Sequence, residues 1–229
     1  MKPRSRKGVF VWLASLWLAG CASYQPGVVV DRPIPFGNER EALTREYLQQ
    51  RYGLPGEDAS IRPRMVVLHW TAIPTLEGSF GAFEPETLPD TRGDIQQGGA
   101  LNVSAHYLVD RDGTIYRLLP DTLMARHTIG LNHCAIGVEN VGGTPQTPLT
   151  PAQLRANVWL VRELARKYPI EYVIGHHEYT LFEGHPYWLE KEGGYRTEKT
   201  DPGKEFMEGV REELTDMPLK PLPNTPQEL

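Results

Sequence analysis

Two short motifs near the C-terminal end of the chain restrict what it can fold into more than any other feature. G-H-H-E-Y begins at Gly175, directly after the apolar segment 172–174, and K-T-D-P-G ends at Gly203. His69 follows a second apolar segment, 65–68, in the same manner. Two histidines and one aspartate are the usual protein ligands of a catalytic zinc, which keeps one position for water. The pattern favours a hydrolytic metal site at the edge of a sheet.

Each of these residues also has an ordinary alternative role. A histidine near a strand end is often only a hydrogen-bonded side chain, and Asp-Pro-Gly can be a simple turn. His176 and His177 are adjacent, so they would point to opposite sides of an extended chain, and only one should ligate. The metal site is favoured because three suitable ligand types occur together.

Further motifs extend the pattern over most of the chain. In order, they are V-V-L-H-W-T (66–71), N-V-S-A-H-Y-L-V-D-R-D-G-T-I-Y (102–116), A-R-H-T-I-G-L-N-H-C-A-I-G-V-E-N-V-G (125–142), V-I-G-H-H-E-Y (173–179) and K-T-D-P-G (199–203). Together they resemble the zinc-dependent N-acetylmuramoyl-L-alanine amidases of the type 2 family, which includes a phage lysozyme amidase and is similar to peptidoglycan recognition proteins. The resemblance covers about residues 60–215.

The resemblance implies a role for individual residues. The zinc ligands would be His69, His176 and Asp201. Glu139, in the I-G-V-E segment, would be the general base, and Lys199 would help stabilise the transition state. One zinc ion is the implied cofactor, and peptidoglycan or its muropeptide fragments are the implied partner. The bond cleaved would be the amide between N-acetylmuramic acid and L-alanine.

Two features depart from the family pattern. The stretch of roughly twenty residues between His177 and Lys199 is longer than in the smallest members, and Ala105 stands where some members carry a tyrosine. Aromatic residues and one histidine occupy this long segment, 178–198: Tyr179, Phe182, His185, Tyr187, Trp188 and Tyr195. The preference between intact wall and soluble or 1,6-anhydro muropeptides therefore stays open.

The chemistry of amide hydrolysis agrees with these assignments. Zinc lowers the pKa of water toward neutrality, and a base must take a proton and deliver it to the leaving amine. Glu139 follows the apolar segment 135–138, so burial is expected to raise its pKa. Lys199 would stabilise an oxyanion. The ordinary alternatives are a solvent-facing glutamate and a solvated loop lysine.

The remaining histidines and Cys134 carry weaker signals. His127 and Asn132 precede the I-G-V-E segment and are predicted to border the pocket as substrate-binding residues. His106 is either a neighbour of the metal ligands or a core histidine. Cys134 is predicted to be a small buried apolar filler, because that is the common role of a free cysteine. The histidines predicted to lie on the surface or in loops are His133 and His185.

The first residues have the features of an export signal. Four cations form a positive start: Lys2, Arg4, Arg6 and Lys7. The apolar segment 9–19 has signal-peptide length and is short for a membrane span. L-A-G-C at 18–21 resembles the lipobox of bacterial lipoproteins, so Cys21 is the predicted lipidation site. Ala22 then fits sorting to the outer membrane, facing the periplasm. An ordinary secretory signal or a short membrane anchor is the alternative.

Composition excludes one class of partner. The chain has 24 Lys and Arg against 29 Asp and Glu, a formal charge of −5; loss of residues 1–20, which hold four cations and no acid, leaves −9. No basic patch remains outside the N-terminus, so nucleic acid is not an expected partner. With Cys21 lipidated, Cys134 has no partner within the chain, and no disulfide is expected.

The pattern of apolar segments predicts one α/β domain with a central mixed β-sheet flanked by α-helices. Strands are predicted at 65–70, 104–110, 114–119, 135–141 and 171–175. Helices are predicted at 39–52, 151–167 and near 203–215, with an apolar stripe through Leu154, Val158, Val161, Ala165 and Tyr168. The predicted divisions are a signal peptide at 1–20, a tether at 21–38, the zinc amidase domain at 39–216 and a Pro-rich tail at 217–229, with a long Gly-rich loop at 77–101.

Two other functions remain open at this point. The first is a peptidoglycan-binding module without catalysis, and the second is a zinc amidohydrolase that acts on another acyl peptide. Non-catalytic relatives are expected to lack part of the ligand set. Retention of His69, His176, Asp201 and Glu139 therefore favours the enzyme.

Overall fold

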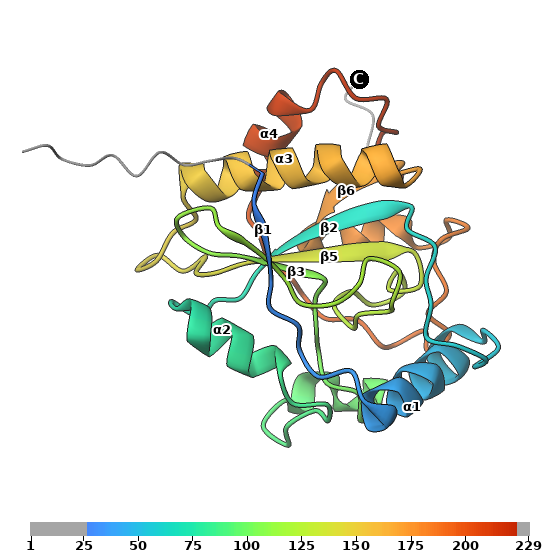
Figure 1. Cartoon of the computed structure of the whole chain (residues 1–229). Coiled ribbons are helices and arrows are strands. Elements are labelled where there is room, and N and C mark those ends of the chain that lie inside the picture. Colours follow the sequence, from blue (N-terminus) through green and yellow to red (C-terminus); the bar gives the residue numbers. More distant parts are fainter. Residues whose placement is uncertain (1–26, 224–229) are drawn as a thin grey trace, which may run out of the picture.

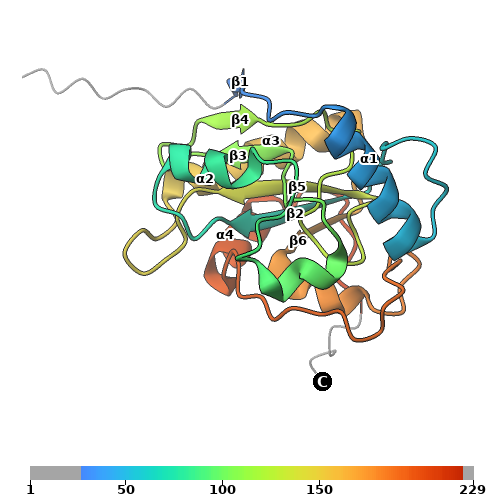
Figure 2. The ribbon, with the colours of Figure 1, turned by 90° about the horizontal axis from the view of Figure 1, so that it is seen from below.

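A six-stranded mixed sheet forms the centre of the protein in this computed structural model, which describes residues 27–223 (Figures 1 and 2). The strands are β1 (Val29–Asp31), β2 (Met65–Trp70), β3 (Tyr107–Val109), β4 (Ile115–Arg117), β5 (Ala135–Asn140) and β6 (Tyr172–Gly175). Their order is β1-β4-β3-β5-β2-β6, and only β3 and β4 run antiparallel, as the predicted hairpin. The predicted α/β class is confirmed. The predicted signal peptide and the predicted lipidation site, Cys21, lie outside the described residues.

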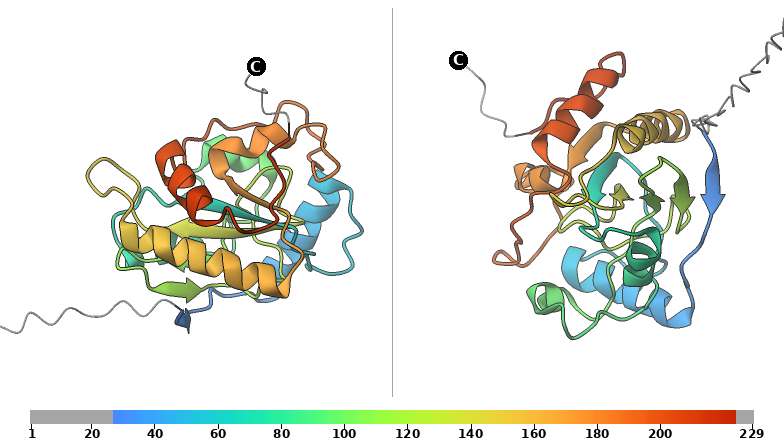
Figure 3. Two further views of the ribbon diagram at one scale, coloured as in Figure 1. Left: turned by 90° about the horizontal axis from the view of Figure 1, so that it is seen from above. Right: turned by 90° about the vertical axis from the view of Figure 1, so that its left-hand side faces the viewer.

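Helices cover both faces of the sheet. The longer ones are α1 (Asn38–Tyr47), α2 (Leu76–Phe83), α3 (Pro151–Lys167) and α4 (Lys204–Glu213), and the shorter turns are η1 (Leu48–Tyr52), η2 (Gly93–Gly98) and η3 (His176–Phe182). Figures 1 and 3 show α3 and α4 over one face, with α1 and α2 on the other side. No helix within residues 27–223 has the length and apolar character needed to cross a membrane.

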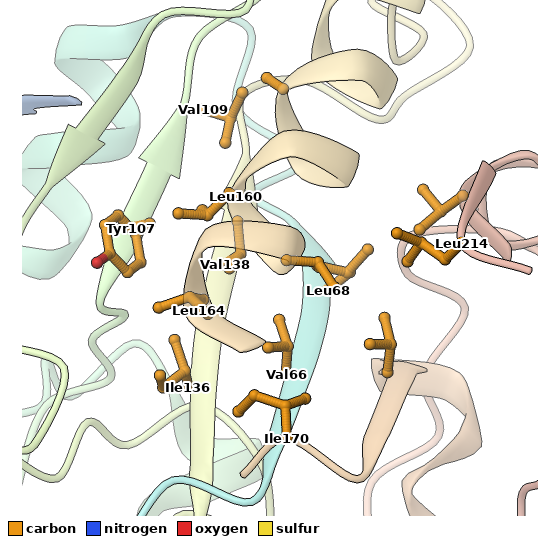
Figure 4. Packing of buried hydrophobic residues seen from close by; sticks show 14 of the residues in the cluster. Val66, Leu68, Tyr107, Val109, Ile136, Val138, Leu160, Leu164, Ile170 and Leu214 are labelled. Atoms are coloured by element: carbon orange, nitrogen blue, oxygen red, sulfur yellow. The ribbon is translucent and has the colours of Figure 1, made fainter. Parts of the chain in front are cut away.

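Alternation along the central strands decides which side chains reach α3. Val66 and Leu68 of β2 pack with Ile136 and Val138 of β5 beneath Leu160 of the helix (Figure 4). Burial of each such side chain stabilises the fold by about 1.5–3 kcal/mol. Successive side chains of a strand point to opposite faces. The residue after Leu68 therefore points away from α3, and that residue is His69.

Helix α3 begins as predicted, but its buried face is displaced. Thr150 Oγ1 accepts a hydrogen bond from the backbone N–H of Gln153 at 3.1 Å, and the Gln153 side chain accepts one from the Thr150 N–H at 2.9 Å. The fully buried apolar side chains of α3 are Ala156, Leu160, Val161 and Leu164, whereas Leu154, Val158 and Ala165 are half-buried. The buried face is therefore turned around the helix from the predicted stripe, because α3 packs against both the sheet and α4.

The segments predicted to be a loop, a tether and a tail all contribute to the folded domain, the first two with regular structure and the third by packing alone. The predicted loop 77–101 contains most of α2 and all of η2. Within the predicted tether, β1 pairs with β4. In the predicted tail, Met217 and Leu219 pack against the core. These pieces are short, and pairing or burial against distant residues stabilises them, so local sequence signals were insufficient.

Candidate metal centre and active site

Three neighbouring parallel strands end at the same level and bring the site together. In the pairing of β2 with β5, His69 lies opposite Glu139. In the pairing of β2 with β6, Leu68 lies opposite Gly175, so His176 follows at the level of His69. Ligand sites of open α/β sheets lie at these carboxyl ends of the strands. Glu139 and His176, which follow His69 by 70 and 107 positions in the sequence, thereby become its neighbours.

The three predicted ligands present their donor atoms to one another. His69 Nδ1 lies 3.0 Å from His176 Nδ1 and 3.2 Å from Asp201 Oδ2, and His176 Nδ1 lies 3.0 Å from the same Oδ2. Ligand atoms at roughly 2.0–2.1 Å from a tetrahedral zinc would be about 3.3 Å apart. The triangle therefore fits a zinc ion with little adjustment, and within the described residues it is the one cluster of this kind.

Burial and mutual charge favour the ligating forms of these side chains. His69, His176 and Asp201 are only 1%, 7% and 8% exposed. Burial, followed by repulsion from His69, lowers the pKa of His176 to about 4, so the ring is neutral at pH 7. Burial alone would raise the pKa of Asp201, but interaction with the two histidines outweighs it and holds the pKa below its usual range. A neutral imidazole and an ionised carboxylate are the forms that bind a metal.

Glu139 lines a cleft together with the three ligand residues, and one of its carboxylate oxygens has no hydrogen-bond partner within residues 27–223. Its Oε2 is buried and has no hydrogen-bond partner among the described residues. Burial raises the pKa of Glu139 to about 7, with Asp201 raising it further and His69, Lys199 and Arg92 lowering it. A carboxyl group that titrates near neutral pH is suited to proton transfer. The predicted effect of burial on this residue agrees with the structure.

His177 is turned away from the ligand triangle. Its backbone N–H donates to the carbonyl oxygen of Asp201 at 3.0 Å, and its Nδ1 lies 3.0 Å from the same oxygen. His177 therefore holds the Asp201 backbone and presents no nitrogen to the cluster. On the other side, Asn140 Nδ2 donates to the carbonyl of His69 at 2.9 Å. Both ligand-bearing segments are anchored through their main chain.

His127 and Asn132 line the cleft, as predicted, but their polar atoms are engaged within the protein. His127 Nδ1 lies 3.0 Å from His69 Nε2. Asn132 Oδ1 accepts from the backbone N–H groups of His127 and Thr128, at 3.0 and 2.7 Å. His106 is fully buried, and its ring lies edge-on to His127 with centroids 5.9 Å apart. His106 is thus a buried neighbour of the histidine cluster.

Arg126 and Thr128 were missed by the sequence analysis, although both flank His127 in A-R-H-T. Thr128 Oγ1 is 2.9 Å from His127 Nδ1. The Arg126 guanidinium donates to the carbonyls of Gly99 and Leu101 and, at 2.6 Å, to that of Ile95. A buried arginine with three carbonyl partners is a structural brace. Their position next to His127 in the A-R-H-T segment was the sequence feature that could have indicated a role for Arg126 and Thr128.

The cleft above the triangle is large enough for a substrate group. Its volume is about 260 Å³, whereas about 10–15 Å³ on the same measure is enough to hold one water. Lys199, Arg92 and Thr197 line it together with Glu139. The Thr197 Oγ1 atom is buried and has no hydrogen-bond partner among the described residues. Both orphaned oxygens, on Glu139 and Thr197, therefore belong to this cleft.

The other predicted residues lie outside the cleft. Cys134 is buried beside the Leu131 carbonyl, and burial raises the pKa of its thiol, consistent with a filler role. His133 lies in a loop, as predicted, and is half-buried against Tyr52, so burial lowers its pKa to about 4. His185 lies in a turn beside the Tyr172 hydroxyl.

Comparison with known proteins agrees with this site. The family model described as N-acetylmuramoyl-L-alanine amidase (Amidase_2) matches residues 59–204, more than half of the chain. The endolysins of Enterobacteria phage K11 and Escherichia phage T7 are 31% and 33% identical to it over 88 residues, which are 36% of this chain and 58% of each endolysin. The chain therefore belongs to the N-acetylmuramoyl-L-alanine amidase family. The matched part is less than two thirds of the length of these endolysins.

A solved structure supports the fold. The N-acetylmuramoyl-L-alanine amidase LysC from Clostridium intestinale URNW is 20% identical and matches with a TM-score of 0.50. The match covers 85% of this chain and 99% of that one. The described domain thus corresponds to nearly the whole of that amidase in its arrangement of helices and strands.

Proposed function

We propose that this protein is a zinc hydrolase that cleaves the amide bond between N-acetylmuramic acid and L-alanine in peptidoglycan or its fragments. The observation that carries the proposal is that the ligand triangle and Glu139, whose buried Oε2 has no hydrogen-bond partner among the described residues, line the same cleft. A purely structural zinc site has no need for a carboxyl group held near neutral pKa in the same cleft. Membership of the amidase family supports the bond assigned.

His69, His176 and Asp201 would hold the zinc ion. When bound, zinc supplies a Lewis acid that makes water available as a nucleophile near neutral pH. The neutral state of His176 and the ionised state of Asp201 prepare the site for a divalent cation without the release of protons.

Glu139 is the proposed proton carrier. Its carboxylate takes a proton from the attacking water as the water oxygen adds to the carbonyl carbon of the lactyl group. It then gives that proton to the alanine nitrogen as the carbon–nitrogen bond breaks. Lys199, which lines the same cleft, stabilises the negative charge that develops on the carbonyl oxygen. Burial raises the pKa of Glu139 to about 7, a value at which the group can both accept a proton from water and donate it to the amine.

Defined muropeptides test the proposal. The zinc-loaded protein is incubated with N-acetylmuramoyl peptides, and the products are identified by mass. The expected products are the free sugar and a peptide that begins with L-alanine. Binding without cleavage would instead support a recognition module, and cleavage only of peptides that lack muramic acid would support a different amidohydrolase. Intact walls and 1,6-anhydro muropeptides, compared at equal concentration, would rank the substrates.

We also propose that Cys21 is lipidated and holds the enzyme at the outer membrane, facing the periplasm. The support comes from sequence alone, namely the positive start, the apolar segment and L-A-G-C. A cysteine that carries several acyl chains anchors stably, whereas a single chain anchors only marginally. Cys21→Ser should abolish lipid labelling and move activity to the soluble fraction. Persistent labelling, or a wild-type protein that is already soluble, would refute the anchor.

A further inference from the structure

We infer that His127 is a positioning residue: it fixes the proton on His69 Nε2, so that the lone pair of His69 Nδ1 is directed at the ligand triangle. The inference rests on the proposed metal site. His69 uses both ring nitrogens, with Nδ1 facing His176 and Asp201 and Nε2 lying 3.0 Å from His127 Nδ1. A histidine ligand is oriented by the partner of its other nitrogen. Here that partner is a second imidazole.

The direction of the hydrogen bonds is set by a backbone carbonyl. His127 Nε2 lies 3.3 Å from the carbonyl oxygen of Ala135, and a carbonyl oxygen only accepts. The proton of a neutral His127 therefore sits on Nε2, and its Nδ1 must accept. Two groups lie within donating distance of this nitrogen, His69 Nε2 at 3.0 Å and the Thr128 hydroxyl at 2.9 Å. We assign the donation to His69 Nε2, which leaves His69 Nδ1 unprotonated. The first residue of β5 thus selects the tautomer of a ligand on β2 through one intervening ring.

The His127 ring is held in this position by its surroundings. The ring lies against Gly137, where a Cβ atom would come within 2.6 Å of His127 Cγ. Such a distance is incompatible with any side chain at position 137 unless the ring moves. His106 flanks the ring and accepts the Gly137 N–H at 3.0 Å, so it holds the same stretch of β5. The glycine of I-G-V-E is therefore required for space beside the ligand's partner.

Thr128 provides a second acceptor for the same proton. Its Oγ1 lies 3.5 Å from His69 Nε2, at the outer limit of a hydrogen bond, and 2.9 Å from His127 Nδ1. Removal of the His127 acceptor alone would allow the Thr128 hydroxyl to replace it in part. The decisive variants therefore include Thr128→Val, which keeps the shape and removes the hydroxyl.

Two isosteric substitutions isolate the hydrogen bond. In His127→Asn the amide oxygen replaces the accepting Nδ1, whereas His127→Leu has the same shape and no acceptor. Each is made with and without Thr128→Val, and zinc affinity is measured by competition with a chelator. We expect His127→Leu with Thr128→Val to bind zinc about 10- to 100-fold more weakly than wild type, the usual effect of losing such a partner. His127→Asn should recover most of this loss. His133→Leu, in the same loop, should leave affinity unchanged.

A second measurement reads the tautomer directly. In the zinc-free proteins, the side-chain nitrogen resonances of His69 should report the Nε2-protonated form in wild type and His127→Asn. In His127→Leu with Thr128→Val they should report a mixture of tautomers. Equal zinc affinity in wild type and this double variant would overturn the positioning role, as would equal losses in the Asn and Leu variants. A wild-type protein that binds no zinc would instead refute the proposed function.

Discussion

The two halves of the cleft are positioned by different kinds of interaction. His69, Glu139 and His176 stand at the ends of three hydrogen-bonded parallel strands, so the backbone ladder sets their spacing. A second part of the lining, called the wall below, includes Ile95 of η2 and Tyr195 and Thr197 of the long segment 178–198. Backbone hydrogen bonds within these segments are mostly those of local turns. The strand half is suited to chemistry that tolerates little movement, and the wall is suited to variation in what the cleft admits.

In the wall, the side chains of two arginines make the connections that backbone hydrogen bonds make between the strands. Arg126 donates to the carbonyl of Ile95 and, at 3.2 Å, to the Tyr195 hydroxyl, and so joins η2 to the long segment. Arg51 pairs with Glu190 at 2.8 Å and its guanidinium lies 4.4 Å from the centre of the Tyr195 ring. Side chains from the body of the domain therefore hold loops that have little regular structure of their own.

The largest expected effect lies in the strand half. Glu139→Gln should lower kcat/KM by about 10²-fold or more, because the proton carrier is lost. Zinc affinity and the folded structure should be retained, since Glu139 is no ligand. Muropeptide turnover and chelator competition measure the two properties. Near-normal turnover would remove Glu139 from the mechanism, and Glu171→Gln, outside the cleft, provides a carboxylate control with unchanged turnover.

The same residue should make the zinc-free protein less stable as pH rises. The pKa of Glu139 is about 7 in the folded state and 4.5 in the ordinary case, so the folded state retains a proton that the unfolded chain releases between these values. The free energy of unfolding therefore falls as pH rises through this window and is constant above it. At about 1.4 kcal/mol per pKa unit, this difference predicts that Glu139→Gln is about 3–3.5 kcal/mol more stable than wild type at pH 8 and almost equal to it at pH 4.

Urea unfolding at several pH values, with a chelator present, measures this difference. The control has the opposite sign. A hydrogen bond from Lys220 lowers the pKa of Glu171, so Glu171→Gln should be less stable than wild type at neutral pH. This difference should shrink as pH falls below the ordinary carboxyl pKa and vanish below the lowered pKa of the folded state. If the free energy of unfolding of Glu139→Gln exceeds that of wild type by the same amount at pH 4 and pH 8, packing and not ionisation is responsible.

In the wall, Arg126→Met should destabilise the protein by about 2 kcal/mol, because buried carbonyls lose their donor. It should raise KM more than it lowers kcat, since the ligands and Glu139 stay in place. Cleavage within 93–101 by a protease should become faster. Arg126→Lys keeps a charged donor, so its stability and KM should lie between those of wild type and Arg126→Met. If Arg126→Met lowers kcat as strongly as Glu139→Gln does, the two halves are not independent.

The smallest expected effect belongs to Tyr195→Phe. This change removes the hydroxyl that accepts from Arg126 and donates to the Ile95 carbonyl, but keeps the ring beneath Arg51. The expected loss is about 1 kcal/mol or less, with a change in KM below about threefold, measured by thermal unfolding and steady-state kinetics. An effect as large as that of Arg126→Met would make the tyrosine the principal brace of the wall.

The strand half was the part of the site that the sequence predicted well. A short apolar run precedes each of His69, Glu139 and His176, and the motifs were specific enough to name these three residues. The K-T-D-P-G motif likewise named Asp201, which lies in a turn outside the strands. The wall was predicted poorly. η2 lies in a Gly-rich stretch without an apolar period, and its contacts come from Arg126 and Arg51. No local pattern indicates which distant side chain will satisfy a loop carbonyl.

By itself, the sequence determined the elements that carry the chemistry: the ligand types, the carboxylate after an apolar strand, and the family. The tertiary structure decided how they meet. The register of three parallel strands puts His69, Glu139 and His176 at one level, and a ring above Gly137 brings His127 to His69. Strand propensity and apolar period are local properties, whereas register, burial and hydrogen-bond partner depend on residues far apart in the chain.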